Sequence, residues 1–294
     1  MSAQVAGPQA PAAAAKAPEP HASIRARRVR RRVILNLARL ALVVVAVGGW
    51  ELLVRAGHID PFFWGQPSGV WDTLKTWVTV GTPQGSLAEQ ILVTLQEAVY
   101  GFAIGVTLGV VLGIALGRNA FLADLFSPFI KVANSIPRIV LGALFVLAFG
   151  FGLTSKVVLA VVLVFFGVFF NAFQGTREVD RNLIANARIL GASRWQTTRQ
   201  VILPSAFTWI LASLHISFGF ALIGAVVGEL LGADKGMGLL IRSSQNNFQV
   251  NGVLAGMVVI AVIALAAEAL ITALENRLLR WRPSTTRTAD VTGV

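Results

Sequence analysis

Six long apolar runs separated by short polar segments constrain the fold of this chain more than any other feature. The runs lie at about residues 33–54, 91–116, 130–150, 156–173, 207–231 and 253–275. About 20 apolar residues in a helix cross a hydrocarbon core of about 30 Å. Only 13% of the 294 residues are charged, whereas about a quarter are charged in a typical soluble domain. We therefore predict an all-α polytopic membrane protein with six transmembrane helices.

The same pattern divides the chain into segments. We expect a disordered basic tail at residues 1–32, a first transmembrane helix at 33–55 and an extracytoplasmic linker at 56–90. Residues 91–280 would hold the other five helices and a cytoplasmic loop at 174–204, before a second disordered tail at 281–294. The basic segment before the first apolar run also fits a signal peptide, but the run lacks a clear A-x-A cleavage site. We favour an uncleaved span.

The distribution of basic residues orients the chain. Seventeen of the 25 Lys and Arg residues lie in the two tails, at the turn near Arg118 and in the 174–204 loop, whereas five lie in the segments on the opposite side. Because Lys and Arg concentrate in the cytoplasmic loops of membrane proteins, this asymmetry predicts cytoplasmic N- and C-termini. The same bias explains the net charge of +11, so we expect no nucleic acid as a partner.

Sequence motifs for catalysis are absent. The chain has no G-x-x-x-x-G-K-[ST] loop for nucleotide phosphates, no H-E-x-x-H and no G-x-S-x-G. It has no cysteine, and its three histidines are far apart in the sequence. We therefore expect no catalytic residue, no metal site and no cofactor bound by this chain.

A glycine recurs at every fourth position of the second apolar run. The five glycines are Gly101, Gly105, Gly109, Gly113 and Gly117. At 3.6 residues per turn they share one face of a helix, and small residues let a second membrane helix approach closely. We interpret this glycine stripe as a surface for tight helix packing, with a sliding surface as the alternative.

Ionisable side chains inside the predicted spans are costly if they face lipid, at about 2.5–3.5 kcal/mol near the middle of a helix. We expect Glu229 and Glu268, which lie near the ends of their spans, to reach water. Five polar residues are candidates for contact with a solute in a transport path: Asn134, Ser135, Arg138, His215 and Ser217. The alternative for the first three is a position at the membrane surface, and for His215 it is a hydrogen bond that supports packing.

The segment Ala185–Pro204 is a polar, basic projection between two apolar runs. Residues 180–190 have the apolar spacing of an amphipathic helix, which Gly191 should end. Ser193 is suited to cap a second short helix, and Pro204 either ends that helix or begins the next span. We expect two short helices joined by a glycine turn, a form that suits docking into a groove of another protein.

This segment resembles the cytoplasmic loop of the membrane permease subunits of binding-protein-dependent ATP-binding-cassette (ABC) importers. The family pattern is E-A-A, three residues, G, nine residues and I-x-L-P. Here it corresponds to Ala185-Asn186-Ala187, Gly191 and Val201-Ile202-Leu203-Pro204, with both gaps kept and the glutamate replaced by Ala185. Other stretches are similar to the subgroup that imports sulfonates, taurine, nitrate and related small solutes: Pro67–Trp71, Gly101-Phe102, Gly152–Lys156 and Gly228–Gly238. The resemblance covers about residues 60–280.

The resemblance implies a type I ABC importer permease architecture in a bacterial cytoplasmic (inner) membrane. A second copy of the permease, two cytoplasmic ATPase subunits that bind ATP and Mg²⁺, and an extracytoplasmic solute-binding protein would complete the importer. The resemblance also implies which residues couple the chain to the ATPase: Ala185, Ala187, Arg188, Gly191, Ala192, Ser193, Arg194, Leu203 and Pro204. The implied solute is an organic sulfonate such as taurine, with nitrate or a vitamin precursor as alternatives.

Two functions from other classes are weighed against this one. An ion-coupled secondary transporter typically has internal repeats and ionisable residues that pair inside the membrane, and neither is evident in the sequence. A membrane scaffold without a transport path is the other alternative. The importer permease is favoured because a chain without a nucleotide site of its own would need such a loop to use ATP.

Overall fold

The computed structural model describes residues 21–179 and 181–278. These residues form helices joined by short turns, and no strand occurs among them. The chain divides into two units, Met1–Ile59 and Asp60–Val294. The first unit holds helix α1, and the second holds the other helices.

Helix α1 runs from His21 to Arg55, and its part Val33–Arg55 is long and apolar enough to cross a membrane. The expectation of a disordered tail at residues 1–32 is wrong for residues 21–32, which are helical, while residues 1–20 lie outside the described chain. Arg and Ala are good helix formers, and extending a helix already nucleated by the apolar run adds one hydrogen bond for each residue fixed.

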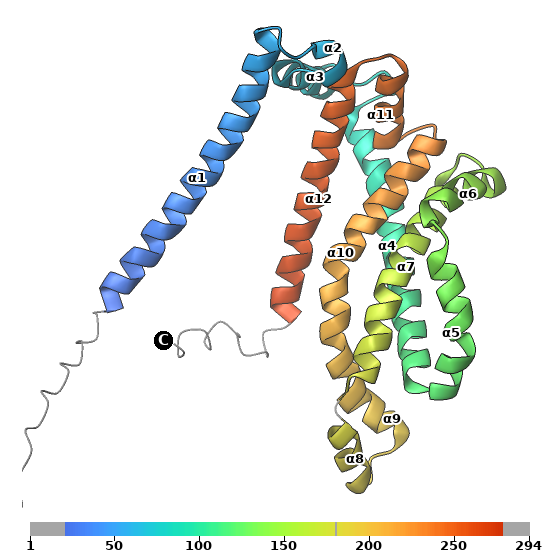
Figure 1. Ribbon diagram of the computed structural model, residues 1–294. Coiled ribbons are helices and arrows are strands. Elements are labelled where there is room, and N and C mark those ends of the chain that lie inside the picture. The colour runs from blue at the N-terminus through green and yellow to red at the C-terminus, as the bar shows by residue number, and fades with distance from the viewer. Residues whose placement is uncertain (1–20, 180, 279–294) are drawn as a thin grey trace, which may run out of the picture. The chain divides into compact units, whose positions relative to one another are not determined.

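Four long helices of the second unit form a bundle. They are α4 (Leu87–Arg118), α7 (Leu153–Arg177), α10 (Leu203–Leu231) and α12 (Val250–Leu278). Helix α7 contacts both α4 and α10, which also contact each other, and α12 packs against α10 (Figure 1). With α1, five helices are long and apolar enough to cross a membrane, and a bent pair supplies a sixth span. The expectation of an all-α fold with several membrane spans is confirmed.

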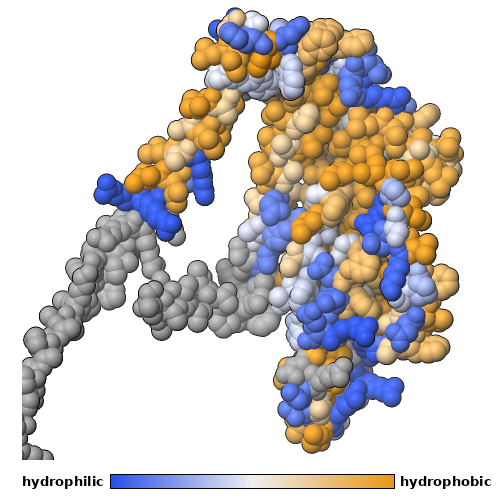
Figure 2. Space-filling model, viewed as in Figure 1, coloured by the Kyte–Doolittle hydropathy of each residue, from blue (hydrophilic) through white to orange (hydrophobic). Residues whose placement is uncertain are grey.

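The bundle has two different ends. Helices α3 (Pro67–Thr79) and α11 (Met237–Asn246) contact the bundle where α4 and α12 begin and α10 ends, which we call the α11 end (Figure 1). The opposite end carries α8 (Arg181–Ile189) and α9 (Arg194–Thr197) and is called the α8 end. Figure 2 shows apolar residues over much of the visible face of the bundle and polar residues gathering toward the α8 end.

The glycine stripe of α4 lies against α7. A Cβ atom added to Gly105 would lie 2.8 Å from Cβ of Val164, and one added to Gly113 would lie 2.7 Å from the carbonyl oxygen of Phe169. Gly101, Gly109 and Gly117 meet α7 in the same way. Lipid removes the hydrophobic drive between membrane helices, so the van der Waals contact that this close approach permits favours α4–α7 association.

The third span differs from the expected helix at 130–150. Helix α5 (Ala120–Ser135) is followed by a 3₁₀ turn η1 (Arg138–Val140) and α6 (Leu141–Phe149), and the two parts are bent by 72°. Pro137 has no N–H to donate and pushes the residue before it toward an extended conformation. Ile136 has this conformation, with φ −72° and ψ 129°. The bend therefore follows directly from the Ile136-Pro137 step.

The expected linker at 56–90 is mostly helical. Helix α2 (Pro61–Trp64) begins with a proline, and Asp60 accepts a hydrogen bond from the Phe62 N–H at 2.8 Å. Helix α3 also begins with a proline, a residue whose fixed φ and missing N–H suit the first helical position. Helix α4 already starts at Leu87, where the hydroxyl of Ser86 caps it.

Candidate functional site

The loop at the α8 end is built from two short helices whose ends are tied by local hydrogen bonds. Gly191 has a φ of +81°, the Ala192 N–H donates to the carbonyl of Ala187 at 3.0 Å, and the Gly191 N–H donates to Arg188 at 3.0 Å. This is the Schellman pattern that ends a helix on a glycine. The expected glycine break therefore has a defined geometry at which any side chain would be strained.

Ser193 begins the second short helix, α9. Its hydroxyl accepts from the Gln196 N–H at 3.2 Å, and the Ser193 N–H donates to the Gln196 side chain at 2.8 Å. This reciprocal pair is a capping box. A π-helical turn η2 (Thr198–Ile202) joins α9 to α10, and Leu203 and Pro204 lie in the first turn of α10. Pro204 thus begins the next span instead of ending the loop helix.

The tip of this loop presents apolar side chains outside the bundle. Ile189 and Leu190 are 81% and 87% exposed, and Trp195 is 65% exposed. Ala185, Arg188, Gly191, Ser193 and Arg194 are also exposed, whereas Ala187 and Ala192 are half-buried. A single exposed apolar residue is ordinary, but a cluster at a loop tip marks an interaction surface. We call Ile189, Leu190 and Trp195 the loop tip.

A second polar group lies at the bend of the third span. The Arg138 guanidinium donates to Asn134 and lies over the ring of Phe166, with Cζ 4.5 Å from the ring centroid. Ser135 donates to the backbone carbonyl of Lys131 at 2.9 Å. The Nε atom of Arg138 is buried without a partner. The Arg138 guanidinium at the bend therefore has an N–H group that is free to donate a hydrogen bond.

His215 lies between two carboxylates of α12. Its Nδ1 is 2.8 Å from Oε1 of Glu268, and its Nε2 is 2.6 Å from Oε2 of Glu275. The Glu268 carboxylate is therefore half-exposed and is also paired with His215 of α10. Ser217 is buried, and its hydroxyl would lie 3.7 Å from a Cβ atom added to Gly167 on α7. The solute-path candidates therefore form separate contacts, with Asn134 and Arg138 joined to each other and His215 joined to α12.

The expectation that Glu229 reaches water is wrong, because this side chain is fully buried at the α11 end. Its carboxylate accepts from the hydroxyl of Thr94 at 2.7 Å and from the N–H of Gly238 at 2.5 Å. The Thr94 hydroxyl in turn accepts from the Met237 N–H at 2.9 Å. A buried carboxylate is tolerated where such donors surround it. Glu229 therefore ties α4, α10 and the start of α11 together.

Two further buried ionisable residues lie beside Glu229. Lys156 is 1% exposed and donates to the backbone carbonyls of Phe151 and Gly152, the latter at 3.0 Å. Glu97 is 3% exposed and lies within hydrogen-bonding reach of Glu229. We call Thr94, Glu97, Lys156 and Glu229 the buried polar cluster. It brings together carboxylates that the sequence did not show to be paired.

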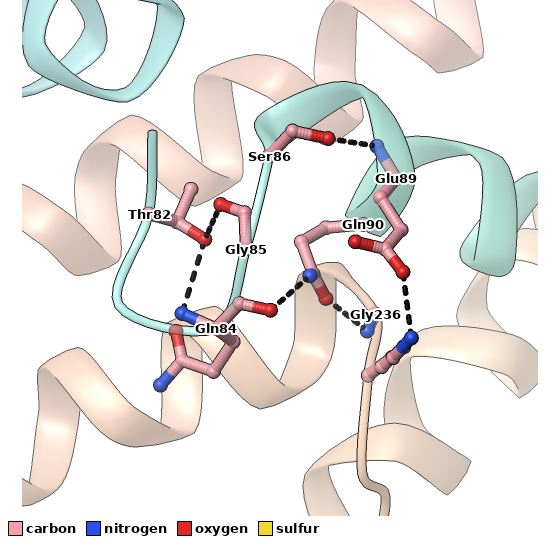
Figure 3. A network of polar contacts seen from close by, with 8 residues as sticks. Thr82, Gln84, Gly85, Ser86, Glu89, Gln90 and Gly236 are labelled. Atoms are coloured by element: carbon pink, nitrogen blue, oxygen red, sulfur yellow. Dashed lines mark hydrogen bonds and ion pairs between the residues drawn. The ribbon is translucent and has the colours of Figure 1, made fainter. Parts of the chain in front are cut away.

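Further polar contacts join the start of α4 to the loop before α11 (Figure 3). The Gln90 side chain accepts from the Gly236 N–H at 2.7 Å and donates to the Gln84 carbonyl at 3.0 Å. Lys235 is 2.6 Å from a carboxylate oxygen of Glu89. The hydrogen bond from this pair and the charge of Glu89 raise the pKa of Lys235 above its usual range. The α4 start and the 232–236 turn are therefore held together by several polar contacts.

Comparison with known proteins identifies the family of this chain. The family described as "Binding-protein-dependent transport system inner membrane component" matches residues 105–280. The chain belongs to this family. It is therefore an importer permease subunit and a multi-pass protein of the inner membrane, as the loop pattern indicated.

Relatives of the permease include two sulfonate-related proteins. The putative aliphatic sulfonates transport permease protein SsuC of Bacillus subtilis is 30% identical, with 83% of this chain and 87% of the relative covered. The taurine transport system permease protein TauC of Escherichia coli is 32% identical, with 85% of this chain and 90% of the relative covered. These relatives are transport permeases and not enzymes.

A solved structure supports the fold of the permease. A crystal structure of an amino acid ABC transporter with histidines matches with a TM-score of 0.54 at 20% identity, covering 64% of this chain and 92% of that one. At this identity the match shows the fold alone. It agrees with the expected importer permease architecture.

The buried polar cluster of the permease could have been suspected from one sequence signal. Gly236 and Gly238 follow Glu229, and a Cβ atom at Gly238 would lie 2.9 Å from the Glu229 carboxylate. Gly236 has a φ of +117°, which a side chain rarely adopts. In this chain the two glycines let the backbone approach the Glu229 carboxylate, to which the Gly238 N–H donates.

Proposed function

We propose that this permease couples solute movement to ATP hydrolysis on a separate subunit through the loop at its α8 end. The loop tip carries the proposal: Ile189, Leu190 and Trp195 are exposed on two helices held by a Schellman pattern and a capping box. An apolar helix tip on a fixed backbone suits a groove on a partner protein. The sequence has no P-loop, so nucleotide chemistry needs a partner.

The proposal includes the rest of the importer. Two ATPase subunits bind ATP and Mg²⁺ on the cytoplasmic side, and the excess of Lys and Arg predicts that the loop lies on this side. A second copy of this chain completes the path, and an extracytoplasmic protein delivers the solute to the α11 end. The family description, which names transport dependent on a binding protein, supports this arrangement.

A continuous helical segment offers a mechanical link between the loop and the membrane. Helix α9, the π-helical turn and α10 follow one another without a break from Arg194 to Leu231. Because a packed helix moves as a unit, force on α9 would shift α10 against α7. The path then needs two arrangements of the bundle, which the ATPase biases.

Replacing Leu190 with aspartate should weaken the association with the ATPase. A charge in the centre of an apolar contact costs about 2 kcal/mol or more at a binding hot spot, which is about a 30-fold loss of affinity. The association is measured by co-purification and by surface-immobilised binding of the ATPase subunit of the importer. Val80→Asp is the matched control, because Val80 is 83% exposed near the opposite end. Equal weakening by both variants, or by neither, would remove the loop tip from the interface.

We propose an organic sulfonate such as taurine as the solute, with nitrate or a vitamin precursor as alternatives. Arg138 is the better of the candidate contacts, because its guanidinium lies at a broken span and its buried Nε lacks a partner. Broken helices form the binding sites of many transporters, and Arg suits oxyanions. His215 is less suited, because the carboxylates of Glu268 and Glu275 would repel an anion.

Arg138→Gln should reduce ATP-dependent uptake of the sulfonate about tenfold or more, because a hydrogen bond to a charged group contributes about 1.5–3 kcal/mol. The association with the ATPase should be unchanged, since Arg138 lies outside the loop. Lys131→Gln is the control, because Lys131 is an exposed cation on α5, the helix that precedes the bend. Uptake kinetics with purified binding protein measure the effect. Normal uptake by the Arg138 variant would exclude Arg138 as a solute contact.

A further inference from the structure

A groove at the α8 end of the bundle joins two arginines of the coupling loop to two arginines that neither ATPase coupling nor the solute path explains. It has a volume of about 790 Å³ and is lined by the α4–α5 turn, the end of α7, and parts of α8 and α9. Four arginines line it: Arg118, Arg177, Arg188 and Arg194. We call it the arginine groove.

The arginine groove is strongly cationic. All four arginines are exposed, and among the described residues that line the groove there is no carboxylate. Within the described part of the chain, none of the four forms a salt bridge. Arg177 lies over the ring of Phe173, with Cζ 5.4 Å from the ring centroid. Four guanidiniums without a carboxylate in one hollow repel each other unless an anion lies between them.

One wall of the arginine groove continues into an apolar surface. Phe121 lines the groove and is 72% exposed. Leu125 and Phe129 follow at four-residue steps along α5 and are 50% and 68% exposed. Residues four apart share a face of a helix, so an apolar stripe leads from the arginines along a helix of the third span. The groove therefore combines a site for an anion with a surface for a hydrocarbon chain.

We propose that the arginine groove binds the phosphate headgroup of an anionic phospholipid, with an acyl chain along Phe121, Leu125 and Phe129. The position fits, because α4 and α7, two of the membrane spans, end at Arg118 and Arg177. Guanidinium groups bind phosphate oxygens in a fork geometry, and basic pockets between spans recognise lipid headgroups.

Two other occupants fit the groove less well. A free phosphate ion would fill the cationic side but leave the apolar stripe without a partner. A cytoplasmic protein such as the ATPase could reach Arg188 and Arg194 on the loop, but the stripe lies on a helix of the membrane span, beyond its reach. A bound anionic lipid would contact both the arginines, through its headgroup, and the apolar stripe, through an acyl chain. Its phosphate would also link Arg188 and Arg194 of the loop to Arg118 and Arg177 of the bundle.

Native mass spectrometry of the full chain, purified in detergent and titrated with defined lipids, tests this site. We expect phosphatidylglycerol to bind and phosphatidylcholine to bind more weakly. The substitution Arg118→Gln with Arg177→Gln should weaken phosphatidylglycerol binding on the order of 25-fold, because each cation near an anionic headgroup contributes about fivefold. These two arginines lie outside the residues proposed for ATPase coupling. Arg199→Gln, an exposed arginine outside the groove, should bind as the unmodified protein does.

Three results would overturn the proposal. The double variant could retain phosphatidylglycerol as strongly as the Arg199→Gln control. Inorganic phosphate could bind at the same affinity as the lipid and displace it, which would assign the site to a free ion. The double variant could bind lipid normally but lose the ATPase subunit, which would assign the groove to a protein. Helix content and the melting midpoint, measured by circular dichroism, establish that each variant is folded.

Discussion

The double substitution Gly109→Ala with Gly113→Ala is expected to separate α4 from α7 and to destabilise the permease by about 2–6 kcal/mol, the sum of two overpacked sites. At Gly109 a Cβ atom would lie 3.0 Å from the backbone oxygen of Phe165, and at Gly113 it would lie 2.7 Å from that of Phe169. Backbone atoms cannot rotate away as a side chain can, so α7 itself must shift. Chemical unfolding in detergent micelles, followed by circular dichroism, measures the loss.

Gly219→Ala is the matched control for these substitutions. Gly219 lies inside α10, another long helix of the bundle, and nothing lies within 4 Å of a Cβ atom placed there. Alanine favours a helix over glycine by about 0.8–1.0 kcal/mol, so this variant should be as stable as the unmodified protein or more so. If the stripe variants were as stable as Gly219→Ala, tight packing against α7 would not be the role of the glycines.

The second large effect is expected at Glu229. Glu229→Ala should cost about 3–5 kcal/mol, because removing one member of a buried charged network leaves the others unpaired. The groups that lose their Glu229 partner are the Thr94 hydroxyl and the Gly238 N–H. Unfolding in detergent should show a large loss, and the 232–238 segment should exchange its amide hydrogens faster.

Two further variants distinguish the loss of the buried hydrogen bonds from the loss of side-chain volume in Glu229→Ala. Glu229→Gln keeps one acceptor oxygen and nearly the same shape, so its loss of stability should be smaller than that of the alanine variant. Glu89→Gln removes the partner of Lys235 from an exposed ion pair, where screening by water leaves little effect on stability. Equal stability of Glu229→Ala and Glu89→Gln would show that the buried polar cluster does not hold the α11 end together.

The spans and the loop were predictable because they depend on local patterns. The apolar runs indicated the long helices, and Gly191 and Ser193 indicated where the loop helices end and begin. In the structure, Gly191 has a φ of +81° and Ser193 forms a capping box, as these two residues indicated. Such signals are readable because the hydrogen bonds that fix them join residues within a few positions of each other.

The buried polar cluster was missed because its bonds join distant parts of the chain. Glu229 lies near the end of its span, where reaching water is the simpler interpretation, and its partner Thr94 lies 135 positions away in the sequence. The bend of the third span was missed for another reason, since the apolar run continues on both sides of Pro137. Hydropathy alone does not tell a bent span from a shorter straight one.

ATP-dependent uptake in proteoliposomes tests the central claim most directly. The permease is reconstituted with the ATPase and the solute-binding protein of the importer, and entry of labelled taurine is followed with and without ATP. The account predicts accumulation that needs ATP, the ATPase and the binding protein, and that Leu190→Asp abolishes. Uptake by the permease alone, driven by an ion gradient and unchanged in the Leu190 variant, would contradict it and would indicate an ion-coupled secondary transporter.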